Sequence, residues 1–331
     1  MHYYAKRRLD FGRVFSRIRG GSSLRDIGRE LGYSRTAVAN AVLRLGRQSM
    51  AAHIVSMLDI EFTGGLSFDG LLSAVTSRDY ASHITVRGDK RHELIVTMTQ
   101  ATTERGGNRT EQQTKRMKAK RKSWRPDASL LGESISMIVN ELPRFASDKP
   151  ITIDIDENPM YTKAIDSDLA MRWLKDHDRL AVHRTPGSAP RTPTSPLAFV
   201  NQVDLMIRHR VKEHTRESIA IGQNSVMQMH RMWMFAWDYN TRQPARVRRT
   251  GDVSRLEHAG VHPSTIGGLR KTFYTRRISL RLRPLHQSIK QVWTGDLPSP
   301  PVRWKVGQKR TGPTITQYAL GDLRFAFPQG L

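Results

Sequence analysis

The sequence predicts an α/β fold, a mixed sheet flanked by helices, preceded by a small all-α unit and followed by a basic irregular extension. Two short helical patterns come first, in residues 22–47. Short apolar, alternating or β-branched runs then recur between residues 66 and 182, and amphipathic helical patterns lie between and after them. We therefore predict three parts: residues 1–50, residues 60–240 with a basic insertion at 101–127, and residues 241–331.

The charge of the chain indicates a polyanionic partner. The 331 residues include 54 Lys and Arg against 30 Asp and Glu, which gives a formal net charge of +24, and there is no cysteine. Such an excess favours nucleic acid or an anionic membrane, and the lack of cysteine excludes disulfides, thiol catalysis and Cys-ligated zinc. No run approaches the ~18 apolar residues of a membrane span. We expect a cytoplasmic protein that acts on nucleic acid and has no membrane partner.

The first helical pair has the pattern of a helix-turn-helix. Apolar residues of the segment 22–47 recur at helical spacing on two short helices, with Gly32 at the turn. Ser22 or Ser23 is the expected N-cap of the first helix, and Ser34 that of the second. The open face of the second helix would present donors to phosphates and base edges: Arg35, Thr36, Asn40 and Arg44. The alternative is an ordinary helical hairpin.

The central segment alternates between strand and helix patterns. Strands are expected at 66–72, 83–87, 94–99, 150–156 and 180–182, and helices at 128–142, 164–176, 201–220 and 226–238. The insertion 101–127 holds nine Lys or Arg against three acids, and we expect it to be irregular and to contact phosphates. The extension after 241 shows no strong period.

Three acids stand where carboxylates could converge. Asp69 is expected to close one strand, Asp156 another, and Asp204 lies near the start of a helix. Converging carboxylates bind Mg²⁺ or Mn²⁺ for phosphoryl transfer. The alternatives are structural, since Asp69 precedes Gly70 in a possible turn, Asp156 could form an Asx turn, and Asp204 would favour a helix start.

In this context the sequence resembles the DDE-type insertion-sequence transposases, whose catalytic domain has a ribonuclease H-like fold. The resemblance covers most of residues 22–240 and rests on the helix-turn-helix, on SFDGL, on IDENPMY, which has the Asp-x-x-x-x-Tyr spacing, and on NQVDLMIRHRVKEHTRESIAI. It implies Asp69, Asp156 and Asp204 as the metal-binding catalytic residues, with Arg208 and Lys212 near DNA phosphates. It also implies terminal-repeat and target duplex DNA as partners, and a homo-oligomer at synapsis.

The sequence departs from the family at several points. Asp204 stands where the family usually has Glu, and Glu217 is the alternative third acid. Asp154 shares the strand face of Asp156 and is an alternative second ligand. Relatives often carry an N-terminal zinc ribbon, which this chain lacks.

Two other functions stay open from the sequence. A non-catalytic DNA-binding relative would keep the scaffold without convergent acids. A tyrosine-type recombinase is a weaker alternative that would use residues of the last ninety: Arg270, Arg276, Arg277, His286 and Tyr318.

Overall fold

The computed structural model describes residues 8–58, 60–62, 65–145, 150–215, 220–242, 253–280 and 285–301. It opens with three helices, α1 (Phe11–Arg19), α2 (Leu24–Leu31) and α3 (Arg35–Ser56). Ser23 and Ser34 cap α2 and α3 by accepting backbone N–H groups, as predicted. Gly32 ends α2 in the left-handed conformation at φ 68°, which glycine adopts without steric cost. The chain therefore has two helices joined by a turn where the helix-turn-helix is predicted, and α3 is one helix of 22 residues rather than a short helix and a connector.

A five-stranded mixed sheet forms the centre of the chain. Its strands are β1 (Leu66–Val75), β2 (Ser77–Asp89), β3 (Leu94–Glu104), β4 (Ile151–Asp156) and β5 (Leu180–Thr185), in the order β3-β2-β1-β4-β5. The pairs β1–β2 and β2–β3 are antiparallel, and β1–β4 and β4–β5 are parallel. This α/β arrangement agrees with the predicted fold class and is consistent with a ribonuclease H-like sheet.

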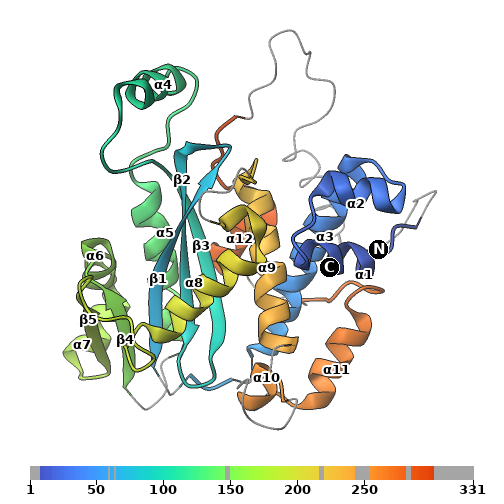
Figure 1. The fold of residues 1–331 in the computed structure, drawn as a ribbon. Helices are drawn as coiled ribbons and strands as arrows, with labels where there is room; N and C mark the ends of the chain where they lie inside the picture. Colours follow the sequence, from blue (N-terminus) through green and yellow to red (C-terminus); the bar gives the residue numbers. More distant parts are fainter. Residues whose placement is uncertain are drawn as a thin grey trace, which may run out of the picture.

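Helices lie against the sheet on both sides (Figure 1). α5 (Leu130–Val139) packs on β2 and β3 and contacts α6 (Pro159–Ser167), and α7 (Leu169–Asp176) contacts β5. On the other side α8 (Ala198–Arg210) packs on β1 and β2, and α9 (Ser225–Arg242) packs on β3 and along α3. Trp233 and Trp237 of α9 are buried in the core. The flanking layers leave the carboxyl ends of β1 and β4 at the same end of the sheet, because these strands run in parallel.

Close packing joins α3 to α9. A Cβ atom on Gly46 of α3 would lie 2.3 Å from Nδ1 of His230, so the two helices approach each other at a residue without a side chain. His230 is buried. The N-terminal helices are thereby attached firmly to the body of the protein.

The structure corrects two expectations about irregular segments. Within the insertion 101–127, residues 101–104 belong to β3, and α4 (Glu111–Arg121) is a capped helix. The region after 241, expected to be irregular, contains α10 (Arg255–His258), α11 (Pro263–Thr272) and α12 (Gln287–Thr294) in its described part. Buried residues of these helices, such as Leu256, Ile266 and Val292, belong to the main hydrophobic core, so this part of the extension is packed against the body.

Two helix and strand ends also differ from expectation. Asp69 does not close a strand, because β1 continues through Val75. The helix predicted at 201–220 is α8, which begins at Ala198 and ends at Arg210, before the 3₁₀ turn η2 (Lys212–His214). Asp204 therefore lies in the middle of α8. No helix in the described part of the chain is long and apolar enough to cross a membrane.

Candidate functional site

Asp69 and Asp156 lie on neighbouring parallel strands. β1 and β4 pair through Leu66 with Ile153 and Ser67 with Asp154. Side chains alternate along a strand, so two residues further on each strand Asp69 and Asp156 share the sheet face of Ser67 and Asp154. Adjacent strands are separated by about 4.8 Å, which allows the two carboxylates to interact. The strand pairing therefore brings together the two acids that the sequence singled out first.

The two carboxylates are half-buried and carry raised pKa values. Burial is the largest cause for both, and the charge of Asp69 raises the pKa of Asp156 further. Each carboxylate accepts one nearby backbone N–H, from Gly70 at 2.7 Å and from Asn158 at 3.0 Å, and these bonds partly offset the cost of burial. Two partly desolvated carboxylates that repel each other favour a bound cation over water.

Asp204 lies on α8, the helix that packs on β1 and β2. The Phe199 ring of α8 fills the space over Gly88, where a Cβ atom would lie 2.1 Å from its Cε1, and Gly88 pairs with Ser67. Because Ser67 and Asp69 share a face, α8 covers the face that carries Asp69. Asp204 is half-buried on this helix.

The Tyr161 hydroxyl lies within electrostatic range of all three acids. Tyr161 lies on α6, and its pKa is raised by burial and by the charges of Asp156, Asp69 and Asp204. The ring packs 6.3 Å from Phe68, between centroids, which places it against β1. Asp156 and Tyr161 are the residues of the Asp-x-x-x-x-Tyr spacing, so that spacing brings a neutral phenol into the electrostatic field of all three carboxylates.

The three acids do not make a closed three-ligand cluster. Among the described residues, no group of three or more His, Asp or Glu side chains could hold a single metal ion. Glu217, the alternative third acid, lies outside the described residues. Asp154 pairs with Lys90 and lies 3.2 Å from Nδ1 of His183, so its carboxylate is already engaged in an ion pair.

His83 is a neighbour of Asp156 that the sequence did not reveal. It lies on β2, and its imidazole covers Gly70, where a Cβ atom would come within 2.4 Å of the ring. Burial lowers the pKa of His83, and the charge of Asp156 partly opposes this. His83 follows Asp69 by fourteen positions in an antiparallel strand, so only the β1–β2 register could have identified it.

Two arginines face Asp69. The charges of Arg191 and Arg208 lower the Asp69 pKa, against the larger effect of burial. Arg208 was predicted near DNA phosphates, and its guanidinium donates to the carbonyl oxygens of Leu72, at 3.3 Å, and His214, at 3.4 Å. These bonds attach the end of α8 to β1. Arg191 lies in the exposed loop before α8 and was not predicted.

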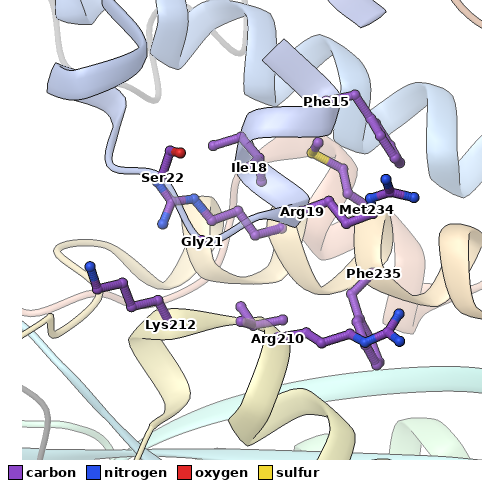
Figure 2. Close-up of a pocket in the computed structure, with 11 residues that line it drawn as sticks. Phe15, Ile18, Arg19, Gly21, Ser22, Arg210, Lys212, Met234 and Phe235 are labelled. Carbon is purple, nitrogen blue, oxygen red and sulfur yellow. The ribbon is translucent and has the colours of Figure 1, made fainter. Parts of the chain in front are cut away.

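Lys212 lies at a seam between the N-terminal helices and the body. Its Cβ is 3.6 Å from where a Cβ of Gly21 would stand, in the turn between α1 and α2. The pKa of Asp26 is lowered, mainly by the Ser23 hydroxyl, and Lys212 is a smaller cause. The seam contains a small cleft with about 30 Å³ of space (Figure 2). Apolar side chains line it together with four cations, which are Arg19, Arg210, Lys212 and Arg231.

The predicted contact residues of the second helix lie at the start of α3. Arg35 and Thr36 are exposed, and Asn40 and Arg44 are half-buried. From Leu43 onward most of α3 is buried, so only its first turns present side chains to a partner. This surface, which we call the α3 entry face, consists of Arg35, Thr36, Asn40 and Arg44.

The residues of the recombinase alternative are dispersed. Arg270 lies on α11, His286 caps α12, and Tyr318 lies outside the described residues. Trp124 packs edge-on against Tyr80 with ring centroids 5.2 Å apart.

No protein-family model and no curated protein matches the sequence. One similar solved structure is a pre-cleavage Mos1 transpososome, with 9% sequence identity over 72% of this chain and 79% of that chain, at a TM-score of 0.20. A TM-score of 0.20 describes little shared geometry.

Proposed function

We propose that the protein is a DDE-type transposase that cuts and joins DNA strands by metal-dependent phosphoryl transfer. The observation that carries the proposal is the pair Asp69–Asp156, two half-buried carboxylates on adjacent parallel strands that repel each other. The same residues carry the family resemblance in SFDGL and IDENPMY. A polynucleotide is the substrate that a chain of net charge +24 would attract.

Asp69 and Asp156 fit a magnesium or manganese ion. Mg²⁺ is commonly bound through one or two carboxylates, with waters and substrate phosphates completing the shell. Asp204 on α8 is the proposed third acid, and the field of all three at Tyr161 supports its placement. Bound metal would supply Lewis-acid activation, first of a water and then of a 3′-hydroxyl, and would stabilise the leaving oxygen.

The residues around the pair have distinct parts in this proposal. Asp69 and Asp156 must be ionised to bind the metal, and their raised pKa values place this requirement above the ordinary carboxyl range. Arg191 and Arg208 bring positive charge toward Asp69, where a DNA phosphate would approach. Tyr161 stays protonated, because burial and the three acids oppose its ionisation.

DNA recognition is assigned to the α3 entry face. Its Arg and Asn side chains suit guanine and adenine edges, and Thr36 suits phosphate or a thymine methyl group. Terminal-repeat DNA would be read here, target DNA would be joined at the carboxylates, and two element ends would require a homo-oligomer.

The test is strand cleavage of a plasmid that carries the gene with its flanking DNA. The wild type should nick or cut this plasmid with Mg²⁺. Asp69→Asn and Asp156→Asn should each reduce the rate of cutting by at least about 10²-fold, while DNA binding persists. Asp176→Asn, an exposed acid at the end of α7, is the matched control. Full cutting by either site variant would refute the mechanism.

A second candidate is a catalytically inactive, transposase-derived DNA-binding protein. The observation that favours it is the lack of a closed three-acid cluster among the described residues. It predicts metal-independent DNA binding by the wild type and no cutting, with Asp69→Asn indistinguishable from wild type in both assays.

A further inference from the structure

The segment 105–126 forms an arm at the end of the sheet, which we call the α4 arm. In Figure 1 the helix α4 stands beyond the tips of β2 and β3, apart from the other helices. A small apolar cluster of Val75, Tyr80 and Met117, with Trp124 packed against it, attaches the arm to the sheet. The Tyr80 hydroxyl also donates to the Trp124 carbonyl oxygen at 3.0 Å.

The inner face of α4 uses its cations for structure. Arg116 donates two hydrogen bonds of 2.8 Å to Asp79, and Lys120 donates one of 2.5 Å to the same carboxylate. Arg121 pairs with Glu104, which Arg109 and Arg125 also approach. Five cations of the arm therefore lie in ion pairs with two acids of the sheet, and these ion pairs attach the arm to the sheet.

The outer face of α4 carries three lysines that differ from the inner cations in their exposure and ion pairing. Lys115, Lys118 and Lys122 are exposed, and no ion pair of the described residues includes them. Their spacing of three and four residues places them within an arc of about 60°, opposite Met117 and Lys120. The stripe extends for about 10 Å along the helix, at 1.5 Å per residue.

From this division of charge we infer that the α4 arm is a clamp for the DNA backbone, and that Lys115, Lys118 and Lys122 bind successive phosphates. One strand of duplex carries a phosphate about every 3.4 Å of axis, so a stripe of about 10 Å spans about three phosphates. Lysine binds phosphate as a point charge, without sequence preference. The inference rests on the proposed function. It assigns sequence-independent binding of the DNA backbone to the lysine stripe of the α4 arm.

The position of the arm determines how far from the reacting phosphate the lysine stripe would contact the DNA. Val75, at the carboxyl end of β1, packs in the cluster that holds Met117, and Asp69 lies six residues earlier on the same strand. Six residues of strand extend over about 20 Å, which corresponds to about six base pairs of duplex at 3.4 Å each. The lysine stripe should therefore contact DNA at least about six base pairs from the phosphate that reacts.

The test measures the salt dependence of DNA binding by the full chain. The triple variant Lys115→Gln, Lys118→Gln, Lys122→Gln is compared with Arg172→Gln, Lys175→Gln, Lys290→Gln, which removes the same charge from exposed positions on α7 and α12. The probes are two unrelated duplexes. For the stripe variant, the slope of log K against log salt should become shallower by about 0.9 per lost phosphate contact, to the same extent for both duplexes.

Each outcome decides the inference. A shallower slope in the stripe variant alone supports it, provided that thermal unfolding of the variant matches the wild type, as expected for exposed lysines. Equal slopes in both triple variants overturn it. Binding to vesicles of anionic lipid is measured in parallel, and a stripe variant that loses affinity for these vesicles but not for DNA also overturns it. A wild type that binds duplex but never cuts it leaves this inference intact and rejects only the catalytic proposal.

Discussion

The carboxylate of Asp69 raises the pKa of Asp156 across two parallel strands. Neither acid contributes to a closed ion pair among the described residues, in contrast to Asp79, Asp154 and Glu104. A fold that keeps two half-buried like charges together sacrifices stability at that point, and such sites are commonly functional.

Removing one charge of the pair should stabilise the protein. A carboxyl pKa that is higher in the folded state means that ionisation is costlier there than in the unfolded chain, so above the raised pKa the charge destabilises the fold. Asp69→Asn or Asp156→Asn removes this cost, and the amide oxygen can still accept the N–H of Gly70 or Asn158. We expect a higher melting temperature for each variant at pH 7 with EDTA.

The control for this prediction is Asp176→Asn, which should leave the melting temperature unchanged. Addition of Mg²⁺ should then raise the melting temperature of the wild type but not of the two site variants. A lower melting temperature of Asp69→Asn in EDTA would show that the pair stabilises the fold, contrary to this account.

The α4 arm should loosen when Asp79 is replaced. Asp79→Asn leaves Arg116 and Lys120 without their carboxylate and should cost about 1–3 kcal/mol, as for other charged hydrogen bonds. Because the arm contacts the body through one small apolar cluster and the ion pairs of Asp79 and Glu104, we expect the loss to be local. Hydrogen exchange should accelerate in α4 and remain unchanged in α3 and α9. Uniform acceleration over the whole chain would contradict a separately anchored arm.

Stability should fall as the pH is lowered below about 6.5. Burial lowers the pKa of His53 to about 4, of His214 to about 4 and of His230 to about 3. Between these values and 6.5 the unfolded chain binds protons that the folded chain does not, so each histidine adds about 1.4 kcal/mol per pH unit to the slope.

The variant His230→Asn isolates one of these contributions. Urea unfolding of the variant between pH 4.5 and 6.5 should show a slope that is smaller than that of the wild type by about 1.4 kcal/mol per pH unit. A cavity left by the smaller side chain lowers stability at every pH and does not change the slope. Identical slopes for the two proteins would mean that His230 titrates normally when folded.

Gly70 should tolerate no side chain. The Cβ atom of Gly70→Ala would lie 2.4 Å from the His83 ring, so the ring must move, at a cost of about 1–3 kcal/mol. Gly106→Ala is the matched control, because nothing lies within 4 Å of its added Cβ. Urea unfolding should separate the two variants. Equal stability would show that the imidazole moves away from Gly70 freely.

Some elements could be predicted because their signals are local. The alternation in ITIDID predicted β4, and Asn158 with Pro159 predicted the break after Asp156, where Pro159 is the first residue of α6. Ser23, Gly32 and Ser34 predicted the ends of α2 and α3 in the same way. These residues determine backbone conformation within a few positions, so no tertiary information is needed.

Other features depend on partners that are distant in sequence. α4 has little apolar surface, and Asp79 and Glu104 provide ion pairs that its own sequence does not reveal. His83 becomes a neighbour of Gly70 only through the β1–β2 register. Asp69 was expected to close a strand, whereas β1 continues to Val75 and Gly70 makes room for the His83 ring.

The most direct test of the account is the binding of Mn²⁺, followed by the electron paramagnetic resonance of the free ion. The wild type should bind Mn²⁺ with Asp69 and Asp156 as ligands, and binding should weaken as falling pH protonates these carboxyls, whose pKa values are raised. Asp69→Asn and Asp156→Asn should each reduce the affinity at least about tenfold, and Asp176→Asn should not change it. Equal Mn²⁺ affinity in all four proteins would contradict a metal centre at this pair.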